Sequence, residues 1–439
     1  MKQSVPASAR KLLDSRWLKV GIGVKRWLVL MLLGLMFSAL GLAFGLRELY
    51  TTVELPAIFY YLTLQFWPRT IRMIILCLVG IMATGIAFRH LNRVLLSAAL
   101  PRNTAPIDLA ETLIGRSRTR HGPKVVAIGG GHGLSTLLSG LKQYTDNITA
   151  IVAVADDGGS SGRIRQEFGI LPPGDIRRCL AALAEAEPLM TRLFEHRFQA
   201  GSLEGHTFGN LFITALAEVT GSFGEGVREA NRVLAVRGQI VPATLDDVVL
   251  WAELENGEHI SGESRIAKSG QRIKRVYLQP QTALAVRTAI KAIEEADLII
   301  VGPGSLYTSL LSSLMISEVN QAIREATQAV RVYVCNVATE PGETDHFGVR
   351  DHLQALVEHV GPDVFDVALA NSDDRQNHRF APEWQGRTTV VPLDQTTDLP
   401  IRVRTANVIN PANPLRHDPV RLARELMRVL EKERQMGRL

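Results

Sequence analysis

Apolar residues follow two patterns along the chain. Near the N-terminus they run almost without interruption over residues 27–46 and again over 71–88, whereas from residue 124 onward they form short runs between helical segments. A helix of twenty residues is about 30 Å long, the thickness of a bilayer's hydrocarbon core. The pattern therefore predicts a transmembrane hairpin over 27–88, followed by a separate domain.

Basic residues predict the orientation of this hairpin. Lys and Arg are frequent before the first apolar run and after the second, while the connecting loop holds only Arg47 and Arg69. By the positive-inside rule, both termini and the main domain would be cytoplasmic, in a multi-pass inner (plasma) membrane protein. A cleaved signal peptide is the alternative, but the first run is too long for one. We expect a basic N-terminus (1–26), the hairpin (27–88), a linker (89–122) and one main domain (123–439).

The main domain alternates between strand-like and helical segments. The run 124–128 leads into glycines, a helical segment covers 134–144, and a second β-branched run covers 148–154. Strand, turn, helix and strand in this order predict a parallel sheet. Further strands are expected near 247–253, 259–261, 274–278, 297–301, 331–335 and 365–370, mostly alternating with helices. The predicted fold is α/β, with a Rossmann-like, doubly wound, mostly parallel sheet.

Composition narrows the classes of partner. The net charge is +5, but the basic residues cluster beside the apolar runs and form no stripe interleaved with aromatic residues. This argues against a nucleic-acid partner. Cys77, Cys179 and Cys335 form no CxxC pair, which argues against a zinc knuckle and fits a reducing compartment. Domains of this type often form dimers, so a homodimer is compatible with the sequence.

Three glycine-rich turns follow strand-like runs and indicate an anion site. Glycine permits positive φ and close approach of a ligand, and the N-terminus of a helix attracts phosphate. In the first turn, Thr136 stands where a G-x-G-x-x-G pattern needs its last glycine, and no Walker A lysine is present. A tight turn without a ligand is the alternative. The predicted ligand-binding residues here are Gly129, Gly130, Gly131, Gly133 and Ser135.

The second turn adds carboxylates and hydroxyls. Asp156 ends the second strand, where Rossmann proteins carry the acid that holds a ribose, and it could also bind Mg²⁺ with ligand phosphates. Ser160 and Ser161 follow as donors to an anion. The alternative for the neighbouring Asp157 is capping of a turn.

Two further polar clusters and the third turn complete the candidate site. Asp175 and Arg177 lie in the first turn of a predicted helix, where a cation opposes the helix dipole, and such local conflicts often mark functional sites. Asn210 lies one helical turn after His206 and could contact a ligand, although packing is the alternative. The third turn follows the run 298–301, and its predicted ligand-binding residues are Gly302, Gly304 and Ser305.

These motifs together resemble the YvcK-like gluconeogenesis factor family. The segments that carry the resemblance are VVAIGGGHGLSTLLSGLK, VADDGGSSGRIRQEFGILPPGDIRRCLAALA, GHTFGNLF, GESRI, ADLIIVGPGSLYTSLL and VCNVATEPGETDH, within residues 124–430. That family is similar to 2-phospho-L-lactate transferase, in the CofD-like superfamily. The resemblance implies a Rossmann-like fold and a phosphate-bearing ligand. The transferase branch is implied to use Mg²⁺. The YvcK-like branch is implied to bind UDP-N-acetylglucosamine and to support carbon metabolism and cell-envelope morphogenesis.

Two functions are weighed on this basis. The first is a regulatory protein that binds a nucleotide sugar, and the second is a Mg²⁺-dependent transferase acting on a deazaflavin or another phosphorylated acceptor. A third function, that of an NAD-dependent oxidoreductase, is supported only by the strand–turn–strand pattern. Relatives often carry tyrosine where this chain has Phe347, which keeps a ring to stack on uracil but loses its hydroxyl.

Overall fold

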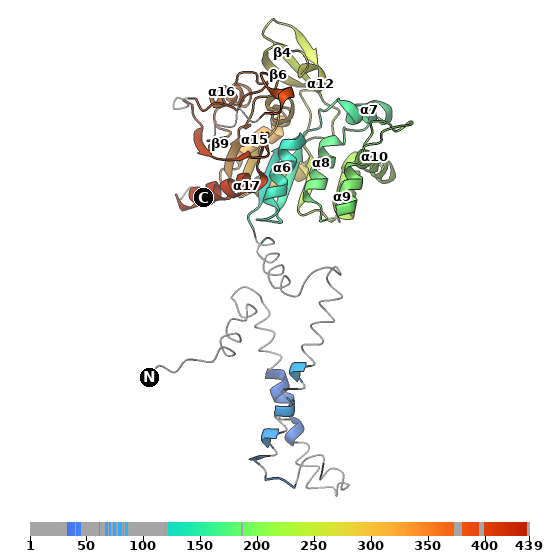
Figure 1. Ribbon diagram of the computed structural model, residues 1–439, viewed down its shortest axis with the longest axis vertical. Coiled ribbons are helices and arrows are strands. Elements are labelled where there is room, and N and C mark those ends of the chain that lie inside the picture. The colour runs from blue at the N-terminus through green and yellow to red at the C-terminus, as the bar shows by residue number, and fades with distance from the viewer. Residues whose placement is uncertain are drawn as a thin grey trace. The chain divides into compact units, whose positions relative to one another are not determined.

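The computed structural model falls into two compact units, Met1–Ser117 and Arg118–Leu439 (Figure 1). In the first unit the described residues are 33–39, 41–44, 61, 66–68, 70, 71, 73–75, 78–80, 82 and 84–86. In the second they are 119, 122–185, 188–372, 380–394 and 399–436. The predicted segments 1–26 and 89–122 lie almost entirely outside the described residues.

The expected membrane hairpin requires correction. Crossing a bilayer takes about 20 consecutive, mostly apolar helical residues. Among the residues that the structure describes, no helix has both the length and the apolar character for such a crossing. The prediction of a multi-pass inner-membrane protein with a hairpin over 27–88 is therefore wrong. The rest of that segment lies outside the described residues.

A seven-stranded sheet forms the centre of the second unit, in the order β10-β9-β8-β7-β1-β2-β3. All neighbouring strands are parallel. The strands are β1 (Val125–Gly129), β2 (Ile148–Val152), β3 (Gln239–Pro242), β7 (Leu298–Val301), β8 (Val330–Val334), β9 (Val367–Asn371) and β10 (Arg402–Ala406). The strands β1, β2, β7 and β9 are buried along their whole length, as apolar runs in a parallel sheet require. This confirms the predicted α/β class with a parallel sheet.

Helices connect the strands and cover the sheet. The helices are α6 (Gly131–Leu141), α7 (Gly159–Phe168), α8 (Gly174–Leu183), α9 (Pro188–Glu195), α10 (Phe208–Thr220), α11 (Phe223–Val233), α12 (Glu263–Ile266), α13 (Arg287–Glu294), the π-helix η2 (Leu306–Leu311), α14 (Ser312–Leu314), α15 (Ser317–Glu325), α16 (Val349–Val360), the 3₁₀ turn η4 (Pro382–Trp384) and α17 (Pro419–Gln435). On one side, α6 packs between α8 and α17 (Figure 1). Asp418 caps α17 by accepting hydrogen bonds from the amides of Val420 and Arg421, as its position before a proline predicts.

Two smaller sheets complete the unit. The strands β4 (Val249–Leu254), β5 (His259–Ser261) and β6 (Ile273–Gln279) form an antiparallel sheet in the order β5-β4-β6. Buried and half-buried residues alternate along β4, so one face packs against the rest of the unit and the other stays open. The hairpin strands predicted at 247–253 and 259–261 are confirmed. A short antiparallel pair, β11 (Ile409–Asn410) and β12 (Asn413–His417), precedes α17.

Candidate functional site

The sheet reverses its order of strands beside β1, and this reversal marks the candidate site. β1 pairs with β2 on one side and with β7 on the other, so successive connections leave β1 in opposite directions. Open α/β sheets bind ligands outside the carboxyl ends of the strands at such a point. A cavity of about 470 Å³ lies there, between the turns that follow β1 and β7.

The cavity brings together residues from distant parts of the chain. Of the predicted site residues, those that line it are Gly130, Gly131, Gly133, Asp156, Asp175, Gly304 and Ser305. The lining residues that the sequence did not single out as ligand-binding include Arg178, Glu263, Asn336, Glu340, Trp384, Arg416 and His417. Asn336 and Glu340 follow strand β8, so the strand-end rule could have indicated them once the order of strands was known.

The first and third glycine turns are shaped mainly by contacts within the protein. A Cβ on Gly133 would collide with the carbonyl of Pro303, and Gly131 has φ of 63°. The amide of Gly131 donates a hydrogen bond of 2.6 Å to the Asp175 carboxylate. The Gly131 amide is therefore already hydrogen-bonded within the protein. Because the glycines carry no side chains, the first and third turns can come into contact.

Asp175 connects the first turn to α8. Its second oxygen accepts a hydrogen bond of 2.5 Å from the Arg178 guanidinium. Burial raises the pKa of Asp175, and Arg178 opposes this effect. Asp175 partly neutralises the charge of Arg178. The positive potential of the cavity therefore comes from Arg178 and Arg416 together and not from Arg178 alone.

Three predicted ligand-binding residues instead form a buried hydrogen-bonded chain. Arg177 Nε donates to Asn210 Oδ1 at 3.1 Å, and Asn210 Nδ2 donates to Ser160 Oγ at 3.0 Å. Ser160 Oγ also lies 3.2 Å from His206 Nδ1. None of these four residues lines the cavity. The chain holds α7, α8 and α10 together, which is the packing alternative that the sequence left open for Asn210.

The remaining predicted residues also lie apart from the cavity lining. Gly129 and Gly302 are buried at the ends of their strands, and Ser135 donates its hydroxyl to the carbonyl of His132 inside α6. Ser161 packs against Gly174, where a Cβ would collide with its hydroxyl. Phe347 packs edge-on against Tyr307, with ring centroids 6.4 Å apart. Its ring therefore packs in the hydrophobic core.

Acidic residues form one wall of the cavity. Asp156 accepts a hydrogen bond of 2.8 Å from the Gly158 amide, and Asp157 accepts one of 2.8 Å from the Ser264 amide at the start of α12. The pKa of Glu263 is well above its ordinary value because of burial, with Asp156 and Asp175 adding to the effect. Within the described residues, no group of three or more His, Cys, Asp or Glu side chains is arranged to hold a metal ion.

Two neutral histidines also face the cavity. Burial, together with the charges of Arg178 and Arg416, lowers the pKa of His132 to about 4. Burial lowers the pKa of His417 to about 4 as well, and its Nε2 donates a hydrogen bond of 3.2 Å to the Cys335 carbonyl. At neutral pH, the positive charges of the cavity wall are therefore the two arginines.

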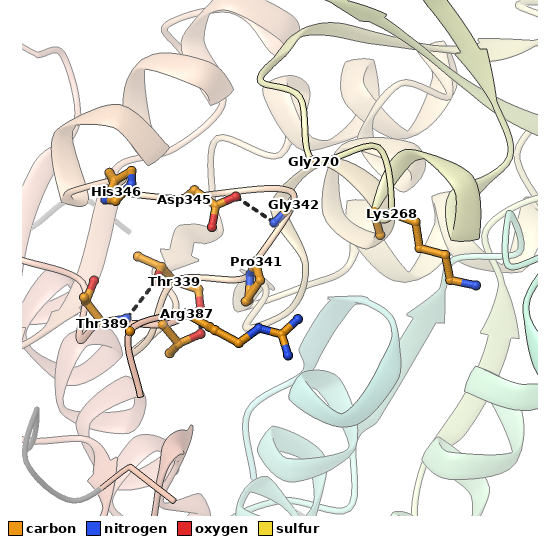
Figure 2. Close-up of a pocket in the computed structure, with 12 residues that line it drawn as sticks. Lys268, Gly270, Thr339, Pro341, Gly342, Asp345, His346, Arg387 and Thr389 are labelled. Atoms are coloured by element: carbon orange, nitrogen blue, oxygen red, sulfur yellow. Dashed lines mark hydrogen bonds between the residues drawn. The ribbon is translucent and has the colours of Figure 1, made fainter. Parts of the chain in front are cut away.

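A second pocket of about 520 Å³ adjoins the cavity, and Thr339, Pro341 and Thr388 line both. Figure 2 shows that Lys268 and Arg387 contribute long cationic side chains to it. It also shows Asp345 turned toward the Gly342 amide, which donates to it at 2.7 Å. The two spaces together offer room for a ligand with an anionic part and a second polar part.

Sequence comparisons place the chain among known proteins. Residues 125–409 match the family described as 2-phospho-L-lactate transferase CofD. The chain is 44% identical over 421 residues to a "Putative gluconeogenesis factor" of Nostoc sp., covering 94% of this chain and 92% of that protein. It is 52% identical over 253 residues to the "Gluconeogenesis factor" of Bacillus subtilis, covering 57% of this chain and 80% of that protein.

A solved structure supports the same placement. A crystal structure of a member of the UPF0052 family from Bacillus halodurans superposes with a TM-score of 0.67 at 42% sequence identity. The match covers 70% of this chain and 99% of that one. The family match, the similar proteins and the similar solved structure agree with the motifs whose residues line the cavity. The chain belongs to the gluconeogenesis factor (YvcK-like) family of the CofD-like superfamily.

Proposed function

We propose that this protein binds a nucleotide sugar, UDP-N-acetylglucosamine, and that it acts as a regulator of carbon metabolism and cell-envelope morphogenesis. The observation that carries the proposal is the cavity between two glycine turns at the reversal point of the sheet, with Arg178 and Arg416 on its wall. Paired cations and backbone groups at strand ends suit a diphosphate. The names of the relatives support a role in gluconeogenesis.

The adjoining pocket supports a ligand longer than a phosphate. With a diphosphate in the cavity, the nucleoside or the sugar would extend past Thr339 and Pro341 toward Lys268 and Arg387. Calorimetric titration of the full chain with UDP-N-acetylglucosamine tests the proposal. Binding that weakens in Arg416→Ala would support it. Heat signals with a deazaflavin and Mg²⁺, and none with the nucleotide sugar, would reverse the ranking of the two functions.

A Mg²⁺-dependent transferase is the second candidate, and the acidic wall of the cavity favours it. Mg²⁺ commonly binds through one or two carboxylates, with ligand phosphates and water completing its shell. Asp156 lines the cavity and fits this requirement, and Glu263, whose pKa is raised by burial and further by Asp156 and Asp175, lies on the same wall. Asp156 would hold the ion, which would neutralise phosphate charge during group transfer. Turnover of a phosphorylated donor that stops in Asp156→Asn would favour this candidate.

A further inference from the structure

Two glutamates contact the turn that follows β7 and the helix η2 after it. Both belong to the segment after β8. Glu343 is only 7% exposed, and Glu340 lines the cavity and is partly open to it. A cavity proposed for a diphosphate therefore has a carboxyl group on its wall, where a charged carboxylate would repel the ligand.

Hydrogen bonds join Glu340 to the turn and Glu343 to η2, the helix that follows it. Glu343 Oε1 accepts a hydrogen bond of 2.8 Å from the Thr308 hydroxyl, and its Oε2 accepts one of 3.4 Å from the Thr308 amide. The Ser305 side chain hydrogen-bonds Glu340. Within the described part of the chain, no lysine or arginine is among the groups that stabilise the charge of either carboxylate.

Without a compensating cation, this pair retains a proton more readily than an exposed carboxyl group. Burial raises the pKa of Glu343 to about 8, and the neighbouring charge of Glu340 contributes to the shift. Burial raises the pKa of Glu340 as well, against the opposing bond from Ser305. The charges of the two carboxylates disfavour each other, so the two groups titrate as a pair.

We propose that Glu340 binds the ligand as a neutral acid, donating its carboxyl proton in a hydrogen bond to an anionic oxygen of the phosphate group. Glu343 accepts hydrogen bonds from Thr308 at both carboxyl oxygens, so the proton that the pair retains lies on Glu340. A protonated carboxyl group is a hydrogen-bond donor, so protonation changes this part of the wall from repelling phosphate to binding it. The inference rests on the proposed binding of a phosphate ester.

Other ionisable groups surround the glutamate pair. They are Glu263 on α12, Tyr307 on η2, Tyr333 on β8, Asp345 and His346 in the same loop, and the cavity residues Asp175, Arg178 and Arg416. Burial raises the pKa of Tyr307 and Tyr333, and both remain neutral. Of the pair, Glu340 bonds Ser305 in the turn after β7, and Glu343 bonds Thr308 on η2.

The test is calorimetric titration of the full chain with UDP-N-acetylglucosamine and separately with pyrophosphate, from pH 6.5 to 9, in two buffers of different ionisation enthalpy. As rising pH removes the shared proton from the pair, the affinity of the wild type should fall by up to tenfold per pH unit, with uptake of a proton on binding. Glu340→Gln keeps a permanent N–H donor, so its affinity should stay within about threefold of the low-pH value and become independent of pH. Glu383→Gln, an exposed neighbour on η4, is the matched control and should behave like the wild type.

Infrared difference spectra of the ligand-free protein give a second readout. A band from a protonated carboxyl group at neutral pH should be present in the wild type and lost in the double variant Glu340→Gln, Glu343→Gln. Binding of pyrophosphate without the nucleotide sugar would refute the proposed ligand while leaving the pH test readable. The inference is overturned if neither probe binds, if the carboxyl band is missing, or if Glu340→Gln keeps the pH dependence of the wild type.

Discussion

The Asn336 side chain and the Gly304 backbone hydrogen-bond each other twice. Asn336 Oδ1 accepts from the Gly304 amide at 3.1 Å, and Asn336 Nδ2 donates to the Gly304 carbonyl at 3.0 Å. A carboxamide satisfies both groups of one residue in this way because it carries a donor and an acceptor side by side. Asn336 therefore holds the turn after β7 in position at the edge of the cavity.

Removing this pair of bonds should weaken ligand binding. In Asn336→Ala the turn loses both bonds, and we expect the affinity for UDP-N-acetylglucosamine to fall about tenfold, equivalent to about 1.4 kcal/mol. Asn336→Asp should bind more weakly still, because it replaces the donor by an acceptor and adds negative charge. Calorimetry on both variants is the measurement. Asn320→Ala is the control, because it removes a hydrogen-bond partner of Arg324 and Asn320 is not among the residues that line the cavity. Unchanged affinity in Asn336→Ala would show that the turn keeps its shape without the side chain.

The two glycines of the first turn should differ in their tolerance of alanine. A methyl group on Gly133 would collide with the Pro303 carbonyl, whereas the space around Gly131 is open and only its φ of 63° opposes a side chain. Gly131→Ala should cost about 1 kcal/mol of stability and Gly133→Ala about 2 to 3 kcal/mol. Urea denaturation of the full chain measures both. Equal costs would mean that the two turns can move apart.

The buried chain around Asn210 should contribute to stability, with no direct role in binding. Asn210→Ala removes the acceptor of Arg177 Nε, leaving a cationic group without this bond in the interior, and removes one of the two partners of the Ser160 hydroxyl, which keeps His206. We expect a loss of about 2 to 4 kcal/mol in the free energy of unfolding. Below the unfolding transition, affinity for the nucleotide sugar should change less than threefold. A large loss of affinity in a folded variant would contradict the placement of Asn210 outside the cavity.

These residues show which features of the site the sequence could predict and which it could not. The glycine turns could be predicted because the conformational freedom of glycine is a local property. The polar residues were harder, because a hydrogen-bonding side chain does not specify its partner. Arg177 and Asn210 were predicted to contact a ligand, and the structure shows them bonded to each other. Asn336 and Arg416 lie far along the chain from the first turn, and only the order of strands brings them to the cavity.

His417 should make stability fall in acid. Its folded-state pKa of about 4 lies below the value near 6.5 of an exposed histidine. The neutral ring is favoured in the fold, so this contribution is complete above pH 6.5 and is lost as the pH falls through 4. The full difference is about 3 kcal/mol. Chemical denaturation of the wild type and His417→Gln between pH 7 and pH 4 measures it. The variant should lose less stability over this range, and parallel curves would contradict the assignment.

Arg416 offers the clearest separation of binding from stability. It is exposed at the end of β12 and lines the cavity opposite the glycine turns, so Arg416→Ala should leave the free energy of unfolding within about 0.5 kcal/mol of the wild type. Losing one cation from a diphosphate site should lower affinity for UDP-N-acetylglucosamine about 10- to 100-fold, and the remaining affinity should depend less on salt. Arg421→Ala is the matched control, because Arg421 lies five residues further on and bonds Asn407 and the Ile409 carbonyl instead of facing the cavity. If both variants bind like the wild type, the phosphate lies elsewhere than between the two turns.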